Sequence, residues 1–197
     1  MRIGSGKKLG AVPGIDYEQS RSEIKSGDVL MYQGHTLPSR IIQWATRSRY
    51  SHAGLAAWWN NRLMVMQAVG KGVVVTPISQ SIRSYHGRVE WFTSAEDIPD
   101  AQRLHLQMIE FAQRELGKEY ALWRTLFLGV RVLLQRDRAS KDKLRREERL
   151  FCSHYVAETY SAIGRDLKKG VSDRFMSPSD IAASPLLKRI GVLRKTK

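Results

Sequence analysis

The sequence predicts an α+β fold in which a small, largely antiparallel sheet packs against helices. Strand-like runs separated by short turns fill residues 29–92, and short connections favour antiparallel pairing. Apolar residues recur every four positions over 104–116, which predicts an amphipathic helix. A second helical pattern over 152–163 begins at the only cysteine. The length of 197 residues suits one domain with extensions.

The predicted domain covers residues 23–185. Residues 1–22 precede it as a basic extension whose Gly-rich start predicts flexibility. A turn containing Gly27 and Asp28 leads into the first strand. Asp28 is expected to cap this turn, because a metal role would need further ligands clustered around it. A helical stripe follows over 39–47.

A hairpin forms the centre of the predicted sheet. Its strands span residues 52–58 and 62–69, and two asparagines between them suit a two-residue turn. Side chains alternate between faces, so His52 and Gln67 should emerge on one face as diagonal neighbours. A loop one residue longer would turn Gln67 to the other face. With further strands at 73–76 and 88–92, the sheet has four or five strands.

Cys152 is the candidate nucleophile. A position near a helix N-terminus favours the thiolate, which is the nucleophilic form. The alternative for a single cysteine is a buried structural role. A histidine partner favours the catalytic alternative, and His52 is the candidate. Gln67 could orient one ring nitrogen of His52 and leave the other for the thiol, as in cysteine hydrolases.

These residues resemble the papain-like NlpC family in its circularly permuted branch, which includes the YiiX and YebB proteins. The resemblance covers roughly residues 25–185, including the segment 177–181. It rests on five short motifs in the permuted order: Gly27-Asp28-Val29-Leu30, Ser51-His52-Ala53-Gly54-Leu55, Met66-Gln67-Ala68, Gly117-Lys118-Glu119-Tyr120 and Phe151-Cys152-Ser153.

The resemblance implies a papain-like NlpC-type fold in circularly permuted order. It implies that Cys152 is the nucleophile, His52 the general base and Gln67 the residue that orients it. The backbone N–H of Cys152 would contribute to an oxyanion hole. Tyr120, Ser153 and Ser51 would lie at the substrate, although Tyr120 could equally be a core residue. No histidine shows zinc-ligand spacing with the cysteine, so neither a metal nor another cofactor is expected.

Two features depart from the family pattern. Gln67 stands where relatives often have Glu or His, and a neutral amide stabilises an imidazolium less than a carboxylate does. A long basic insertion, at about 121–149, separates Tyr120 from Cys152. The insertion could be a lid, a docking helix or a membrane-surface contact, or an ordinary helical hairpin with a solvated arm.

The net charge of +14 predicts attraction to an anionic polymer or surface. The basic extension 1–22 and a basic tail, 186–197, would both contribute. The alternative is a solvated charged face, and no nucleic-acid-binding motif accompanies the charge. The chain has no apolar run of membrane-spanning length, and its N-terminus lacks the apolar core of a secretory signal. We expect synthesis in the cytoplasm, with delivery to the cell envelope or transport in a virion.

The resemblance favours a cysteine hydrolase that cleaves an amide bond in cell-wall peptidoglycan peptides through a thioester. One alternative is a hydrolase of lipid amides or esters, or an acyltransferase, of the same fold. Another is a non-catalytic basic module in a phage particle or secretion machine, where other proteins of the assembly would be its partners.

Overall fold

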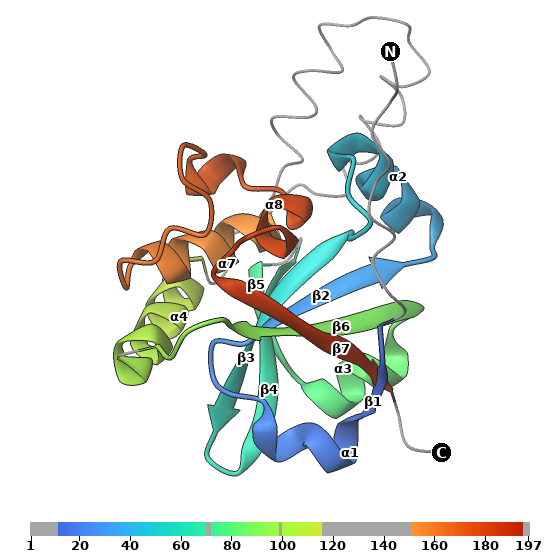
Figure 1. The fold of residues 1–197 in the computed structure, drawn as a ribbon, viewed down its shortest axis with the longest axis horizontal. Helices are drawn as coiled ribbons and strands as arrows, with labels where there is room; N and C mark the ends of the chain where they lie inside the picture. The colour runs from blue at the N-terminus through green and yellow to red at the C-terminus, as the bar shows by residue number, and fades with distance from the viewer. Residues whose placement is uncertain (1–11, 70–71, 99, 116–150, 195–197) are drawn as a thin grey trace, which may run out of the picture.

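The computed structural model describes residues 12–69, 72–98, 100–115 and 151–194, and confirms the predicted α+β class (Figure 1). Seven strands form one mixed sheet in the order β1-β7-β6-β2-β3-β4-β5. Only the β1–β7 pair is parallel among the described strands. The strands are β1 (Gly14–Asp16), β2 (Val29–Gly34), β3 (His52–Trp59), β4 (Arg62–Val69), β5 (Gly72–Pro77), β6 (Gly87–Ser94) and β7 (Leu187–Arg194).

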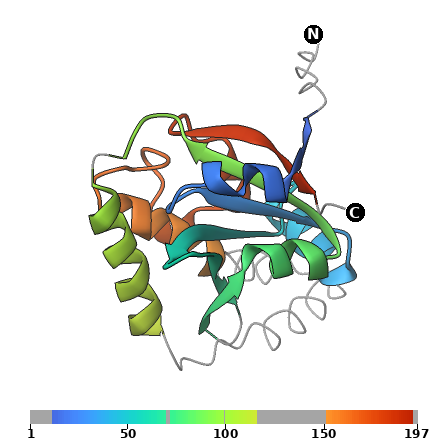
Figure 2. The same ribbon diagram turned by 90° about the horizontal axis from the view of Figure 1, so that it is seen from below.

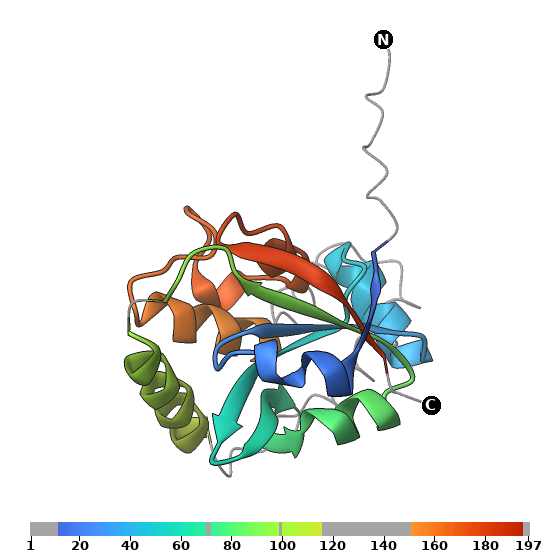
Figure 3. The ribbon, with the colours of Figure 1, turned by 60° about the horizontal axis from the view of Figure 1, so that its bottom comes forward.

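Helices cover both faces of the sheet. The described helices are α1 (Tyr17–Ser20), α2 (Leu37–Thr46), α3 (Ile78–Ser84), α4 (Ala101–Glu115), α7 (Phe151–Ser161) and α8 (Pro178–Ala182). Short 3₁₀ helices follow at η1 (Arg21–Glu23) and η2 (Asp173–Phe175). In Figure 2, α4 lies beside α7, which packs on β3 and β4. In Figure 3, α1 and α3 lie in front of the strands. None of the described helices is long and apolar enough to cross a membrane.

The strands alternate between two apolar cores, as period-two patterning requires. Met31, Leu55 and Met66 belong to one core, which also contains buried side chains of α4 and α7. Leu30, Ala56 and Val65 belong to the other, with Tyr17 of α1 and Ile78 of α3. The central strands therefore carry apolar side chains on both faces, which explains their nearly continuous hydrophobic sequence.

The central hairpin has the predicted register. Trp59 pairs with Arg62 and Leu55 with Met66, so two residues form the turn. Asn60 adopts a φ of 53°, a left-handed conformation that asparagine tolerates better than most residues. The choice of asparagine at this position therefore fixes which side chains of β4 share a face with those of β3.

The sheet is larger than predicted, because two segments expected outside the domain are strands. Residues 187–194 of the predicted tail form β7, and residues 14–16 of the predicted extension form β1. The basic residues of β7 concealed its strand pattern. Leu187 and Leu193 are buried, and the Arg189 guanidinium pairs with the fully buried Glu90 carboxylate at 2.6 Å. The positive charge of Arg189 in β7 is therefore balanced by a buried carboxylate of the same domain.

Asp28 caps the turn before β2, as predicted. Its carboxylate accepts hydrogen bonds from the Lys25 backbone N–H at 2.9 Å, the Trp91 indole N–H at 2.7 Å and the Thr93 hydroxyl at 2.7 Å. Gly27 has a φ of +93°, which favours glycine. The Gly27 carbonyl accepts a hydrogen bond from the Tyr160 hydroxyl of α7 at 2.8 Å. This turn thus joins β2 to β6 and to α7.

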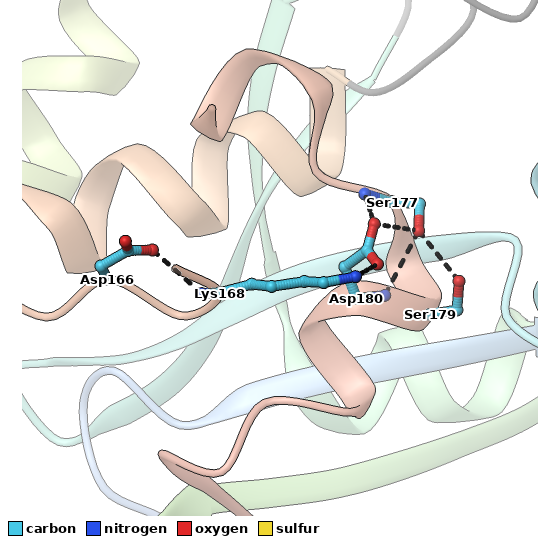
Figure 4. Close-up of polar contacts among 5 residues, drawn as sticks. All are labelled: Asp166, Lys168, Ser177, Ser179 and Asp180. Atoms are coloured by element: carbon cyan, nitrogen blue, oxygen red, sulfur yellow. Dashed lines mark hydrogen bonds and ion pairs between the residues drawn. The ribbon is translucent and has the colours of Figure 1, made fainter. Parts of the chain in front are cut away.

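The segment Ser177-Pro178-Ser179-Asp180 is a helix-starting motif (Figure 4). The Ser177 side chain accepts from the Asp180 backbone N–H at 3.2 Å, and the Asp180 carboxylate accepts from the Ser177 backbone N–H at 2.9 Å. This reciprocal pair is a capping box at the start of α8. Lys168 forms an ion pair with the same carboxylate, which lowers the pKa of Asp180 against the effect of burial.

Replacing Asp28 by Ala should lower the free energy of unfolding by about 2–4 kcal/mol, because the buried Trp91 indole N–H and two other donors lose a charged acceptor. Urea denaturation followed by circular dichroism measures this change. Asp97→Ala is the matched control, since the Asp97 side chain is 98% exposed and 3.7 Å from Lys25. Equal stability of the two variants would contradict the role given to Asp28.

Candidate active site

The candidate site lies where β3 begins and where the first described residues of α7 approach the sheet. The β3–β4 pairing runs from Trp59–Arg62 to Leu55–Met66, so His52 lies three residues beyond its last pair. α7 packs on both strands, and Cys152 is its second residue. The Cys152 sulfur is close enough to the Ala53 backbone for that backbone to lower the pKa of the thiol. The nucleophile candidate therefore lies against the strand that carries the histidine.

His52 and Gln67 lie on one face of the hairpin, as predicted. Gln67 Oε1 is 2.9 Å from His52 Nε2. With this oxygen as acceptor, neutral His52 carries its proton on Nε2, which leaves Nδ1 as the basic nitrogen. The Cys152 thiol lies close enough to the imidazole for its negative charge to raise the pKa of His52. The structure thus brings together Cys152, His52 and Gln67 in the order that the sequence predicts.

The Cys152 thiol has a pKa below its ordinary value. Burial by itself would raise this pKa, but the positive charge and hydrogen bond of His52 lower it more. The neighbouring Ala53 backbone and Ser153 side chain lower this pKa further. Because Cys152 remains partly exposed, the thiolate that these contacts stabilise is accessible for reaction.

The pKa of His52 is shifted in the opposite direction. Burial acts to lower it, whereas the negative charge of Cys152, the hydrogen bond to Cys152 and the hydrogen bond to Gln67 raise it, and the net result is a raised pKa. A lowered thiol pKa and a raised imidazole pKa together favour a thiolate–imidazolium pair. In such a coupled pair, the two protonation steps belong to the pair rather than to either residue.

Two tyrosines that the sequence did not indicate lie near His52, one in contact with its ring and the other behind the first. Tyr32 pairs with His52 across β2 and β3, and their ring centroids are 5.3 Å apart. Tyr85 packs edge-on against Tyr32 at 4.9 Å. Burial raises the pKa of Tyr85, and the charge of Cys152 adds to this effect despite hydrogen bonds from Ser51 and Ser39. Tyr32 could have been found from the pairing of β2 with β3, whereas no local signal marks Tyr85.

The residues predicted to contact substrate have different positions. Ser51 is 6% exposed, and its hydroxyl contacts the Tyr85 hydroxyl at 3.1 Å and the Tyr32 carbonyl at 3.3 Å. Ser153 is fully buried beside the thiol. The Ser51 hydroxyl is therefore occupied by contacts within the fold, whereas the buried Ser153 hydroxyl has no hydrogen-bond partner in the described residues. Contact of either hydroxyl with substrate stays a prediction. Tyr120 and the insertion at about 121–149 lie outside the described residues.

A comparison with solved structures finds a similar fold. The chain superposes on the metalloprotein YiiX of Escherichia coli O157:H7 with a TM-score of 0.58 and 22% sequence identity, over 85% of this chain and 96% of that chain. This likeness shows the fold alone. No protein-family model and no curated protein matches the sequence. In the described part of this chain, no group of three or more His, Cys, Asp or Glu side chains could hold a metal ion.

Replacing Gln67 by Ala should lower the pKa of His52, because the Gln67 hydrogen bond raises it. Gln67→Glu should raise the same pKa further, since a carboxylate stabilises the imidazolium by charge. A proton NMR titration of the His52 ring resonances measures both shifts. Gln102→Ala, at an exposed position of α4, is the control. An unchanged titration of His52 in both Gln67 variants would disprove the orienting role.

Proposed function

We propose that this protein is a cysteine hydrolase with a papain-like, NlpC-type fold in circularly permuted order. The observation that carries the proposal is the contact of Cys152 with His52, whose other ring nitrogen is 2.9 Å from Gln67. The order of elements supports it, because the histidine strand β3 precedes the cysteine helix α7. The likeness to YiiX supports the fold. In this account Cys152 is the nucleophile, His52 the general acid and base, and Gln67 the orienting residue.

The proposed reaction begins with attack of the Cys152 thiolate on a carbonyl carbon, which forms an S–C bond and moves one electron pair onto the carbonyl oxygen. The Cys152 backbone N–H would donate to this oxyanion, as the family resemblance implies. The tetrahedral intermediate collapses with cleavage of the C–N bond. His52 gives its Nδ1 proton to the leaving nitrogen, and a thioester remains.

Hydrolysis of the thioester completes the cycle. Neutral His52, held by Gln67, accepts a proton from water on Nδ1 while the water oxygen forms a bond to the thioester carbon. Collapse of this second intermediate breaks the S–C bond and releases the carboxylic acid. The site returns to the thiolate–imidazolium pair. Each step uses groups of this chain and water.

The substrate proposed first is an amide bond in a cell-wall peptide, which the family resemblance favours. The second candidate is a lipid amide or ester. One observation favours it: α2, which leads into the His52 strand, carries the exposed apolar side chains Leu37 and Trp44. The chemistry at Cys152 is the same for both classes, because each presents an acyl carbon and a leaving group.

Cys152→Ala should lower hydrolysis of the true substrate on the order of a thousandfold or more, because no other described thiol can form the thioester. Purified peptidoglycan stem peptides and N-acyl lipids are incubated with the full-length protein, and released products are measured by mass spectrometry. Acid quenching should trap an acyl group on the tryptic peptide that contains Cys152.

His86→Ala serves as the control variant, since His86 is an exposed loop histidine with no role in the proposed chemistry. Hydrolysis of lipids alone would select the second substrate. Full activity of Cys152→Ala on either substrate would refute the mechanism. An inert thiol together with no hydrolysis of either class would support the non-catalytic basic module.

A further inference from the structure

α2 lies at the same end of the sheet as the candidate site. It connects the end of β2 at Gly34 to the start of β3 at His52, and these antiparallel strands place both residues at one edge (Figure 1). The Gln43 side-chain amide donates to the Gly34 carbonyl at 3.0 Å, which fixes the helix to β2. Arg47 ends the helix with a φ of 50°. α2 is therefore held in place beside the site.

One face of α2 carries large apolar side chains that are exposed. Leu37 is 73% exposed and Trp44 is 64% exposed. They are seven residues apart, so they lie on one face of the helix, with the partly buried Ile41 between them. Single exposed apolar residues are ordinary on protein surfaces, but an aligned group suggests an interaction surface. The exposed face is defined here by Leu37, Ile41 and Trp44.

The surroundings of this face are cationic. No Asp or Glu occurs in the sequence between Asp28 and Glu90. Of the basic residues in that stretch, Arg40, Arg47 and Arg88 lie on or beside α2, whereas Arg49 is paired with the buried Glu90 carboxylate at 2.8 Å. Arg40 and Arg47 are exposed on α2 itself or at its end. The His35 backbone N–H donates to the His86 carbonyl at 3.0 Å, which brings the exposed Arg88 beside the start of α2.

We propose that the Leu37, Ile41 and Trp44 face of α2 docks this protein onto an anionic phospholipid bilayer. Leu37 and Trp44 would enter the boundary between head groups and acyl chains, where aromatic side chains are favoured. Arg40 and Arg47 would contact lipid phosphates. A nucleic acid or an acidic wall polymer would satisfy the charge but offers no apolar layer for the Leu37 and Trp44 side chains.

Docking by α2 would place the start of β3, and so the Cys152 thiol, next to the bilayer surface. The docking proposal does not rest on the proposed catalysis, because no residue of the exposed face belongs to the Cys152, His52 and Gln67 group. The Cys152→Ala variant should therefore bind vesicles as well as the wild type does. A failure of hydrolysis and a failure of docking are thus separate results.

The first test is co-sedimentation of the full-length protein with vesicles of phosphatidylcholine alone or with about a third phosphatidylglycerol. The wild type should bind the anionic vesicles at least about tenfold more strongly, since basic residues near the surface each add to the attraction. The Leu37→Ser, Trp44→Ser double variant should bind them about tenfold more weakly. Arg40→Glu, Arg47→Glu should lose more of the binding than the apolar variant does.

The second test reports insertion rather than charge attraction. Lipids brominated in the acyl chain should quench tryptophan fluorescence of the bound wild type, and Trp44→Ser should remove most of that quenching. Trp59→Ser is the matched control, because Trp59 is 51% exposed at the other end of β3, roughly 23 Å from His52. Thermal unfolding by circular dichroism verifies that each variant folds.

Three results would overturn the proposal. Vesicle binding of the folded Leu37→Ser, Trp44→Ser variant at the wild-type level would show that this face is not the contact. Quenching that depends on Trp59 and not on Trp44 would place the contact at the opposite end. Equal binding to double-stranded DNA by the wild type and both α2 variants, with no binding to vesicles, would assign the basic charge to a nucleic-acid partner.

Discussion

The arrangement of the candidate site depends on the number of residues in the turn between β3 and β4. Asn60 accepts a left-handed conformation and lets β3 and β4 pair without an extra residue. The Gln67 side chain then emerges on the face of His52, where its oxygen is 2.9 Å from the imidazole. One more residue in this turn would send Gln67 to the opposite face. The orientation of His52, and with it the state of the Cys152 thiol, follows from this local backbone choice.

A second constraint fixes the cysteine helix to the sheet. The Gly27 carbonyl accepts a hydrogen bond from the Tyr160 hydroxyl of α7. The neighbouring Asp28 carboxylate accepts hydrogen bonds from the Trp91 and Thr93 side chains of β6. These contacts lie two turns of helix away from Cys152. The turn that begins the first central strand thus sets where the nucleophile meets β3. The Gly27-Asp28 turn, β6 and α7 are far apart in the sequence, and together they hold the cysteine helix against the sheet.

The sequence was sufficient where local rules decide the outcome. The hairpin register and the partnership of His52 with Gln67 follow from turn chemistry and strand alternation. The strand β7 could not be found in this way, because Arg189 is neutralised by Glu90, a partner nearly a hundred residues away. Tyr85 reaches the site only through the packing of α3 against the sheet. Long-range pairing of charges and rings leaves no periodic signal in the sequence.

The most direct test of the Cys152–His52 pair is the rate of Cys152 alkylation by iodoacetamide as a function of pH. In the wild type, the thiol should react at a pH well below the ordinary thiol pKa of about 8.5. In His52→Ala, the contacts that lower the pKa are lost and burial raises it, so the profile should move to higher pH. His86→Ala should match the wild type. A profile unchanged by His52→Ala would contradict the account.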